Sequence, residues 1–276
     1  MEGSRVELRR IDQEESRHDK RALIFIMFTI ITLVFSLFTF MNPAFMKKQI
    51  AKESNSVVVE RFVNEKFDDF AELVGADRNG DANNLLTTKQ TQPIADALVD
   101  YTLGVHWFKA ENASLANEIR YVILHKIDDN SSVEAKSVQK QLKKFSRSGT
   151  YTIITGFDLA AVTLCANIET LFLVINLVII FMCLLAGWSL IKNLKQQVAL
   201  RQLTHIITAA GMWTGTLLIV IYALLALIPL IFNVEGLIFS IGYFLEIASG
   251  IFLELVIVGV ALFIISTITW ELSDPK

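Results

Sequence analysis

Two carboxylates lie within an otherwise apolar stretch near the end of the chain. Glu246, Gly250 and Glu254 are spaced at i, i+4 and i+8, so a helix would place them along one slowly drifting ridge. Ionisable groups inside a membrane are costly and commonly face a bundle interior or a water-filled path. With Asn176 and Tyr222 as polar partners, they predict a proton- or cation-sensitive site, or a polar seam for a small ligand. The alternative interpretation is one or two protonated carboxyls that hydrogen-bond as links between helices.

Three glycines have spacings that suit close helix packing. Gly211 and Gly215 form a GxxxG pattern, and Gly250 lies between the two carboxylates. Glycine at such positions lets the backbone of a second helix approach closely. We expect all three to be used for helix packing.

A short polar stretch resembles the first half of a calcium-binding loop. Asp77, Asn79 and Asp81 match its first three ligand positions. Position six is Ala82 where the loop needs glycine, and position twelve is Thr88 where it needs glutamate. Asp, Asn and Gly are also ordinary turn residues, so a plain turn is the alternative.

The usual catalytic motifs are missing from the sequence. It contains no HExxH, no P-loop, no GxSxG and no GxGxxG. We therefore predict a non-enzymatic protein that needs no cofactor and binds no nucleic acid.

The composition indicates an integral membrane protein. Of 276 residues, 53% are hydrophobic and 19% are charged, against about 45–50% and about 25% in typical globular domains. A spanning helix needs about 20 apolar residues. Four stretches meet that length, and we predict transmembrane helices at 22–45, 169–191, 206–232 and 237–267.

The short flanks predict the orientation of these helices, because Lys and Arg accumulate in cytoplasmic segments. Residues 1–21 and the linker 192–205 are rich in Lys and Arg, whereas the hairpin 233–236 has neither. We expect a multi-pass protein of the cell membrane whose N-terminus and C-terminal tail, 268–276, are both cytoplasmic. Residues 46–168 then form an extracytoplasmic domain inserted between the first two transmembrane helices.

Helical periodicity dominates this inserted domain, which predicts an all-α fold with a small helical bundle. Gly75 is expected to end the first helix, and Pro93 to begin the second. Ser131 and Glu134 form a capping box before the fourth. The apolar stripes are Val59–Val74, Ile94–Phe108, Leu115–Val122 and Ala135–Phe145.

A long helix is expected to lead from this domain into the membrane. Phe157 to Ile191 is 35 residues, with Asp158 as a possible cap. That length is about 52 Å as a helix, well beyond a hydrocarbon core of about 30 Å. No alternating, strand-like pattern is longer than the short run Tyr151–Ile154.

Nearly half of the chain is expected outside and very little inside. This ratio favours a protein whose extracytoplasmic domain senses, binds or scaffolds something. We expect it to contact the lipid bilayer and a protein partner or further copies of itself. The alternative is a subunit of a proton- or cation-coupled transporter or channel that uses Glu246 and Glu254.

Overall fold

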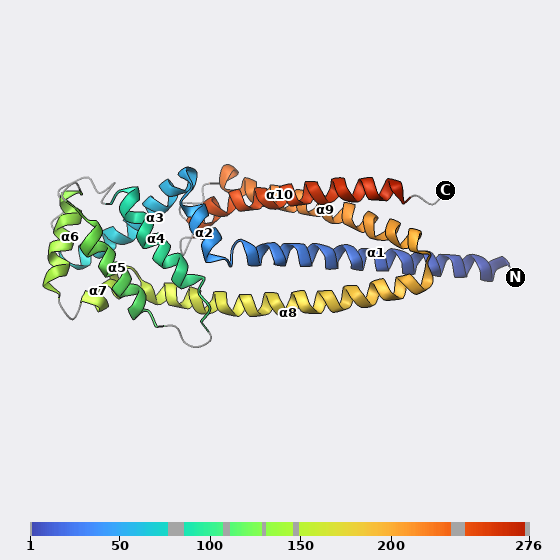
Figure 1. Cartoon of the computed structure of the whole chain (residues 1–276), viewed down its shortest axis with the longest axis horizontal. Helices are drawn as coiled ribbons and strands as arrows, with labels where there is room; N and C mark the ends of the chain where they lie inside the picture. The colour runs from blue at the N-terminus through green and yellow to red at the C-terminus, as the bar shows by residue number, and fades with distance from the viewer. Residues whose placement is uncertain are drawn as a thin grey trace. The chain divides into compact units, whose positions relative to one another are not determined.

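In the residues that it describes, the structure, a computed structural model, is all-α, as the sequence predicts. These are residues 2–76, 86–106, 111–128, 131–145, 149–232 and 241–273, with side chains described from His18 in the first helix and Tyr243 in the last. Within them the chain forms ten helices and no strand (Figure 1). Their bounds are α1 Glu2–Phe38, α2 Pro43–Ile50, α3 Glu53–Leu73, α4 Thr88–Thr102, α5 Ala113–Lys126, α6 Val133–Lys144, α7 Gly149–Gly156, α8 Leu159–Gln197, α9 Leu200–Ile231 and α10 Ile241–Leu272.

Four of these helices are long and apolar enough to cross a membrane, which confirms that part of the sequence prediction. The stretches are His18–Phe38 in α1, all of α8, all of α9, and Tyr243–Leu272 in α10. The shortest has 21 residues, and about 20 are enough to cross the hydrocarbon core.

The first long helix ends earlier than the predicted range 22–45. It stops at Phe38, and a turn leads into α2. Asn42 caps α2, because its side-chain oxygen accepts hydrogen bonds from the backbone N–H groups of Ala44, at 3.0 Å, and Phe45, at 3.2 Å. Pro43 then occupies the first helical position, where a missing N–H costs nothing.

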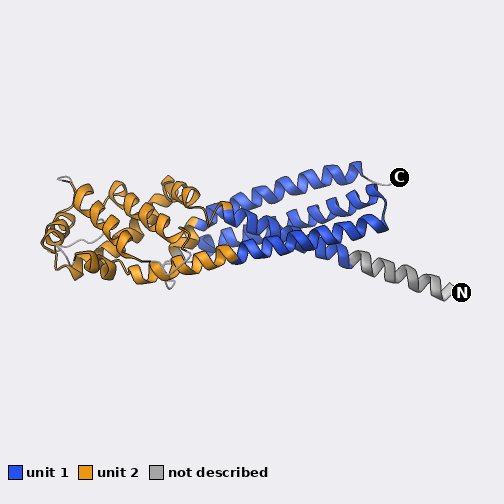
Figure 2. Ribbon diagram, turned by 60° about the horizontal axis from the view of Figure 1, so that its bottom comes forward, with its two compact units in different colours: residues 1–37, 175–232, 248–276 blue, residues 38–174, 233–247 orange. Residues whose placement is uncertain are grey.

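The chain divides into two compact units, coloured separately in Figure 2. Unit 1 contains residues 1–37, 175–232 and 248–276, and it holds most of the four apolar stretches. Unit 2 contains residues 38–174 and 233–247, and it holds α2 to α7.

Unit 2 has a hydrophobic core of its own, built around α3. Phe67 and Phe70 on α3 are fully buried, and the ring of Phe70 lies 5.6 Å from that of Phe157. Gly156 faces Phe70 so closely that a Cβ there would lie 2.6 Å from the ring. Helices α4 to α7 contribute further core residues, including the fully buried Ile94, Leu115, Ile119, Ile123, Leu142 and Ile153.

The buried side-chain amide of Asn64, on α3, holds the segment before α4 against this core. The Nδ2 of Asn64 donates to the carbonyl oxygen of Leu86 at 3.0 Å, and its Oδ1 accepts from the N–H of Leu86 at 2.8 Å. Both residues are buried. The pair therefore satisfies two backbone groups that would be costly to leave without a hydrogen bond.

The helix ends of unit 2 agree with the sequence only in part. Helix α3 ends just before Gly75, whose φ of +63° is the left-handed conformation that glycine tolerates best. Helix α4 begins at Thr88, not at Pro93, because Thr87 and Gln90 form a capping box ahead of it. Pro93 lies inside the helix.

The cap of α6 is displaced by one residue from the predicted one. The hydroxyl of Ser132, not of Ser131, accepts the hydrogen bond from the N–H of Ala135. Ser131 instead accepts from Nε2 of Gln90 at 2.5 Å and from the N–H of Asp128 at 3.0 Å. A contact with another helix thus decides which serine caps α6.

A tight turn joins α7 to the longest apolar helix. The strand-like run Tyr151–Ile154 is part of α7. Asp158 has a φ of 48°, the left-handed conformation that Asp and Asn adopt more readily than most residues. Helix α8 follows with 39 residues, which confirms the long helix expected there.

Candidate functional site

Glu246, the first of the two candidate carboxylates, lies in unit 2 and faces α3. Its Oε2 is 3.5 Å from Nη2 of Arg61, and the two side chains are 23% and 40% exposed. Pairs as exposed as this contribute little to stability, about 0–1 kcal/mol. The same guanidinium lies over the ring of Tyr243, 5.7 Å from its centroid, which adds a cation–π contact.

Within unit 2, further contacts hold the first turns of α10 against α3. The hydroxyl of Tyr243 donates to Oε2 of Glu65 at 2.9 Å. The ring of Tyr243 meets that of Phe62 edge-on, with centroids 5.5 Å apart. We call this set of side chains the α3–α10 contact: Arg61, Phe62, Glu65, Tyr243 and Glu246.

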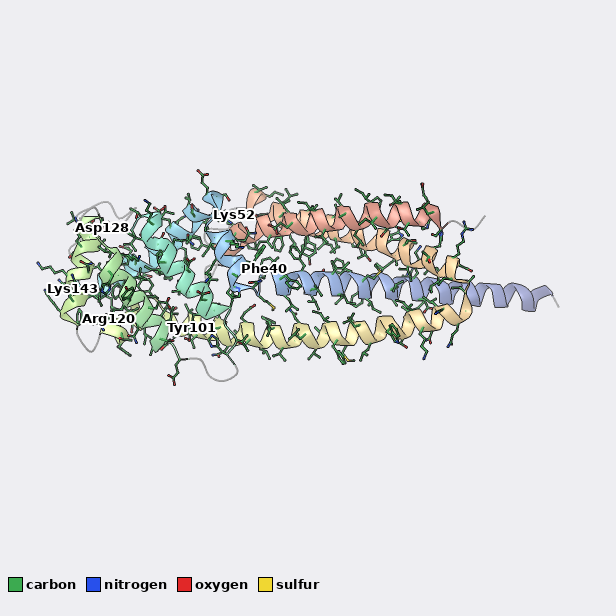
Figure 3. All side chains as sticks on the ribbon, viewed as in Figure 1. Phe40, Lys52, Tyr101, Arg120, Asp128 and Lys143 are labelled. Carbon is green, nitrogen blue, oxygen red and sulfur yellow. The ribbon has the colours of Figure 1, made fainter. Side chains whose placement is uncertain are left out.

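An aromatic pair next to the α3–α10 contact joins the turn that precedes α2 to the start of α10. Phe40, labelled in Figure 3, packs against Phe244 with ring centroids 5.7 Å apart. Phe244 is on α10, next to Tyr243. The start of α10 is therefore held by apolar as well as polar side chains.

Tyr222 is buried in unit 1, where it forms part of the apolar core. Its hydroxyl donates to Oγ1 of Thr32 on α1 at 3.3 Å. Its ring lies 5.9 Å from that of Phe252 on α10. With Leu218 and Leu255, it joins α1, α9 and α10 in one cluster.

The other two members of the predicted polar site also belong to unit 1. Glu254 is half-buried on α10, and Asn176 is half-buried on α8. The four predicted residues are thus divided, with Glu246 in unit 2 and the other three in unit 1.

The predicted packing glycines differ in what surrounds them. A Cβ at Gly215 would lie 2.8 Å from the carbonyl oxygen of Gly259 and 2.9 Å from the backbone nitrogen of Phe263. A Cβ at Gly211 would collide with the Ser266 hydroxyl. Around Gly250 nothing lies within 4 Å of that position. The close approach of α9 and α10 in unit 1 therefore uses Gly259, which the sequence analysis did not single out.

The predicted calcium ligands cannot be placed. Asp77, Asn79 and Asp81 lie outside the described residues. Within the residues that are described, no group of three or more His, Cys, Asp or Glu side chains is arranged to hold a metal ion.

A pocket in unit 2 contains a carboxylate, Glu169, that the sequence analysis did not single out. The pocket forms between the N-terminal part of α8, the segment that follows α4, and the turn after α1. Glu169 lines it and is half-buried. The other lining residues are Met41, Leu103, Gly104, Val105, Thr170 and Leu173.

Three hydrogen bonds hold the wall of this pocket in place. The N–H of His106 donates to Oγ1 of Thr170 at 3.1 Å, and Nε2 of His106 lies 2.7 Å from the carbonyl oxygen of Tyr101. Tyr101, at the end of α4 (Figure 3), also bonds through its hydroxyl to Oγ1 of Thr163 at 3.2 Å. The segment after α4 is thereby fastened to α8.

A signal for Glu169 was present in the sequence. It is the only charged residue between Asp158 and Lys192, and an isolated charge in an apolar run is by default a candidate functional residue. The predicted span 169–191 begins at this residue, and the sequence analysis did not single it out. Because α8 begins ten residues earlier, at Leu159, Glu169 lies well within the helix.

Comparisons with known proteins add no relative to this description, because no protein-family model, curated protein or solved structure matches the chain.

Proposed function

We propose that the chain is a non-enzymatic multi-pass protein of the cell membrane whose helices α2 to α7 lie outside the cytoplasm and bind a protein partner. The role is that of a sensor, binder or scaffold. The proposal combines four long apolar helices with a helical unit that buries its own core. A unit with a core of its own can keep a binding surface in shape before the partner arrives.

Two exposed tyrosines are the observation that carries the proposal. Tyr121 on α5 is 59% exposed, and Tyr151 on α7 is 73% exposed. Tyrosine is enriched in protein interfaces, because it offers a large apolar ring together with a hydroxyl group. The ring of Tyr121 is also stacked on His125, with centroids 4.2 Å apart, so it is already partly ordered.

The helices that carry these tyrosines pack against each other. Oγ1 of Thr150 donates to Oδ1 of Asn117 at 2.8 Å, one residue before Tyr151 and four before Tyr121. The guanidinium of Arg120, labelled in Figure 3, lies against Gly149. Helices α5 and α7 can therefore present both rings on one supported surface.

The orientation in the membrane can be tested by cysteine labelling. The native cysteines, Cys165 and Cys183, are first replaced by serine. A single Lys140→Cys on the exposed side of α6 should then react with an impermeant maleimide on whole cells. The control is Lys192→Cys at the end of α8, which should react only after the cells are opened. The reverse pattern contradicts the proposed orientation.

The binding role can be tested with a photo-crosslinking amino acid at Tyr121 or Tyr151 in living cells. We expect one discrete protein adduct, identified by mass spectrometry, at both positions. The control position is Trp188 on α8 in unit 1, which is 76% exposed and should not give that adduct. Equal adducts at all three positions, or none at the two tyrosines, contradict the proposal.

A further inference from the structure

Among the described residues that line the pocket at Glu169, the side chains are apolar except for the Glu169 carboxylate and the Thr170 hydroxyl. Glu169 is half-buried, and among the described residues neither a hydrogen bond nor an ion pair reaches its carboxylate. A carboxylate shielded from water is costly unless a cation or hydrogen-bond donors compensate it. The pocket therefore favours a cationic occupant over a neutral or anionic one.

The size and composition of the pocket narrow the choice of cation. The hollow has room for about one water-sized group. A primary ammonium group is about that size and carries three hydrogen-bond donors, as in lysine. Quaternary ammonium groups are typically bound in cages of aromatic rings, and among the described residues no aromatic side chain lines the pocket. Calcium takes about six to eight oxygen ligands, far more than one carboxylate and one hydroxyl provide.

The second polar group of the pocket is already oriented. Oγ1 of Thr170 donates to the carbonyl oxygen of Ala166 at 3.1 Å and accepts from the N–H of His106 at 3.1 Å. A hydroxyl oxygen has two acceptor positions, so one remains for a ligand. Because both neighbours are backbone groups, little further ordering is needed when the ligand binds.

We propose that this pocket binds a primary ammonium group, with the Glu169 carboxylate as counter-ion and the Thr170 hydroxyl as a second acceptor. The ammonium belongs to a small alkylamine or to the headgroup of an amino-lipid. The apolar side chains of Met41, Val105 and Leu173 contact the carbon atoms next to the nitrogen. This inference goes beyond the proposed function, because it requires no protein partner.

The test uses the purified full-length chain in detergent and follows its thermal unfolding. Propylammonium chloride should raise the melting temperature in a saturable way, whereas tetramethylammonium chloride and sodium chloride at equal ionic strength should not. Glu169→Gln should weaken the apparent affinity by at least about tenfold, because a hydrogen bond to a charged group contributes about 1.5–3 kcal/mol. Glu118→Gln, an exposed carboxylate on α5, should leave the affinity unchanged.

Lipid nanodiscs distinguish the two sources of the ammonium group. If the ligand is a lipid, phosphatidylethanolamine should stabilise the wild type more than phosphatidylcholine with the same acyl chains, and Glu169→Gln should remove the difference. If it is a free amine, the two lipids should behave alike, and propylammonium should still stabilise the protein.

Several results would overturn the proposal. The first is that neither propylammonium nor phosphatidylethanolamine stabilises the wild type. The second is that tetramethylammonium stabilises it as much as propylammonium does. The third is that the stabilisation is unchanged in Glu169→Gln. If Glu169→Gln does not fold, Leu173→Ala replaces it. That change enlarges the hollow and should admit tetramethylammonium, so unchanged selectivity would also reject the proposed pocket.

Discussion

The crossing of α9 and α10 in unit 1 can be tested with two identical substitutions that should have opposite effects. Gly215→Ala adds a methyl group where the Gly259 carbonyl oxygen would be 2.8 Å away and the Phe263 nitrogen 2.9 Å away. Both atoms belong to the backbone, so the two helices must move apart. Gly250→Ala adds the same group where nothing lies within 4 Å.

The expected magnitudes follow from these surroundings. Overpacking costs about 1–3 kcal/mol, whereas replacing glycine by alanine within a helix favours the helix by up to about 1 kcal/mol. Gly215→Ala should therefore lower the free energy of unfolding by about 0–2 kcal/mol. Gly250→Ala should raise it by about 0.5–1 kcal/mol. The two variants should differ by about 1–3 kcal/mol.

The assay is unfolding of the full chain in mixed micelles of mild detergent and dodecyl sulfate, followed by tryptophan fluorescence. Gly259→Ala serves as a second probe of the crossing, because its Cβ would lie 2.9 Å from that of Leu218 on α9. It should destabilise like Gly215→Ala, and the two changes combined should be less than additive, because they act at one contact. If Gly215→Ala proves as stable as Gly250→Ala, the close approach of the two helices is wrong.

Three further predictions concern unit 2. Asn64→Ala should lower the free energy of unfolding by roughly 2–6 kcal/mol, because two buried backbone groups of Leu86 lose their partner and each costs about 1–3 kcal/mol. A loss below about 0.5 kcal/mol would show that the amide is not needed. A double-mutant cycle of Arg61→Gln and Glu246→Gln should give a coupling free energy below about 1 kcal/mol, since both groups are partly exposed, and a coupling several times larger would mean that the pair is buried. The ammonium group of Lys47 donates a hydrogen bond to the carboxylate of Asp100, and this bond raises the pKa of Lys47 above its ordinary value of 10.5. The hydrogen bond should therefore stabilise the fold fully below pH 10.5, and this stabilisation should be lost as the pH rises through the raised pKa. Lys47→Gln should remove this alkaline step from a plot of the free energy of unfolding against pH.

Several local features of the fold could be predicted from the sequence. Four apolar stretches predicted four long helices, because crossing a hydrocarbon layer requires a length of apolar chain that can be counted directly. Gly75 predicted the end of α3, because a left-handed residue at a helix end strongly favours glycine. Each of these inferences depends on residues close together in the chain.

Helix starts were harder to predict where two neighbouring residues could serve equally well. Ser131 and Ser132 are both good caps for α6. The side chain of Gln90, 41 residues away from Ser131, bonds to Ser131 and leaves Ser132 as the cap. A pattern of nearby residues cannot include that contact.

The candidate site shows the same division between local and distant information. The sequence alone determined that Glu246 and Glu254 are costly charges in an apolar stretch, and that Glu169 is alone in another. Only the tertiary structure decided that Glu246 meets Arg61, 185 residues away, and that Glu169 lines a pocket with residues of the segment after α4. The apolar length of a helix is a sum over adjacent residues, whereas the partner of a charge depends on how distant helices pack.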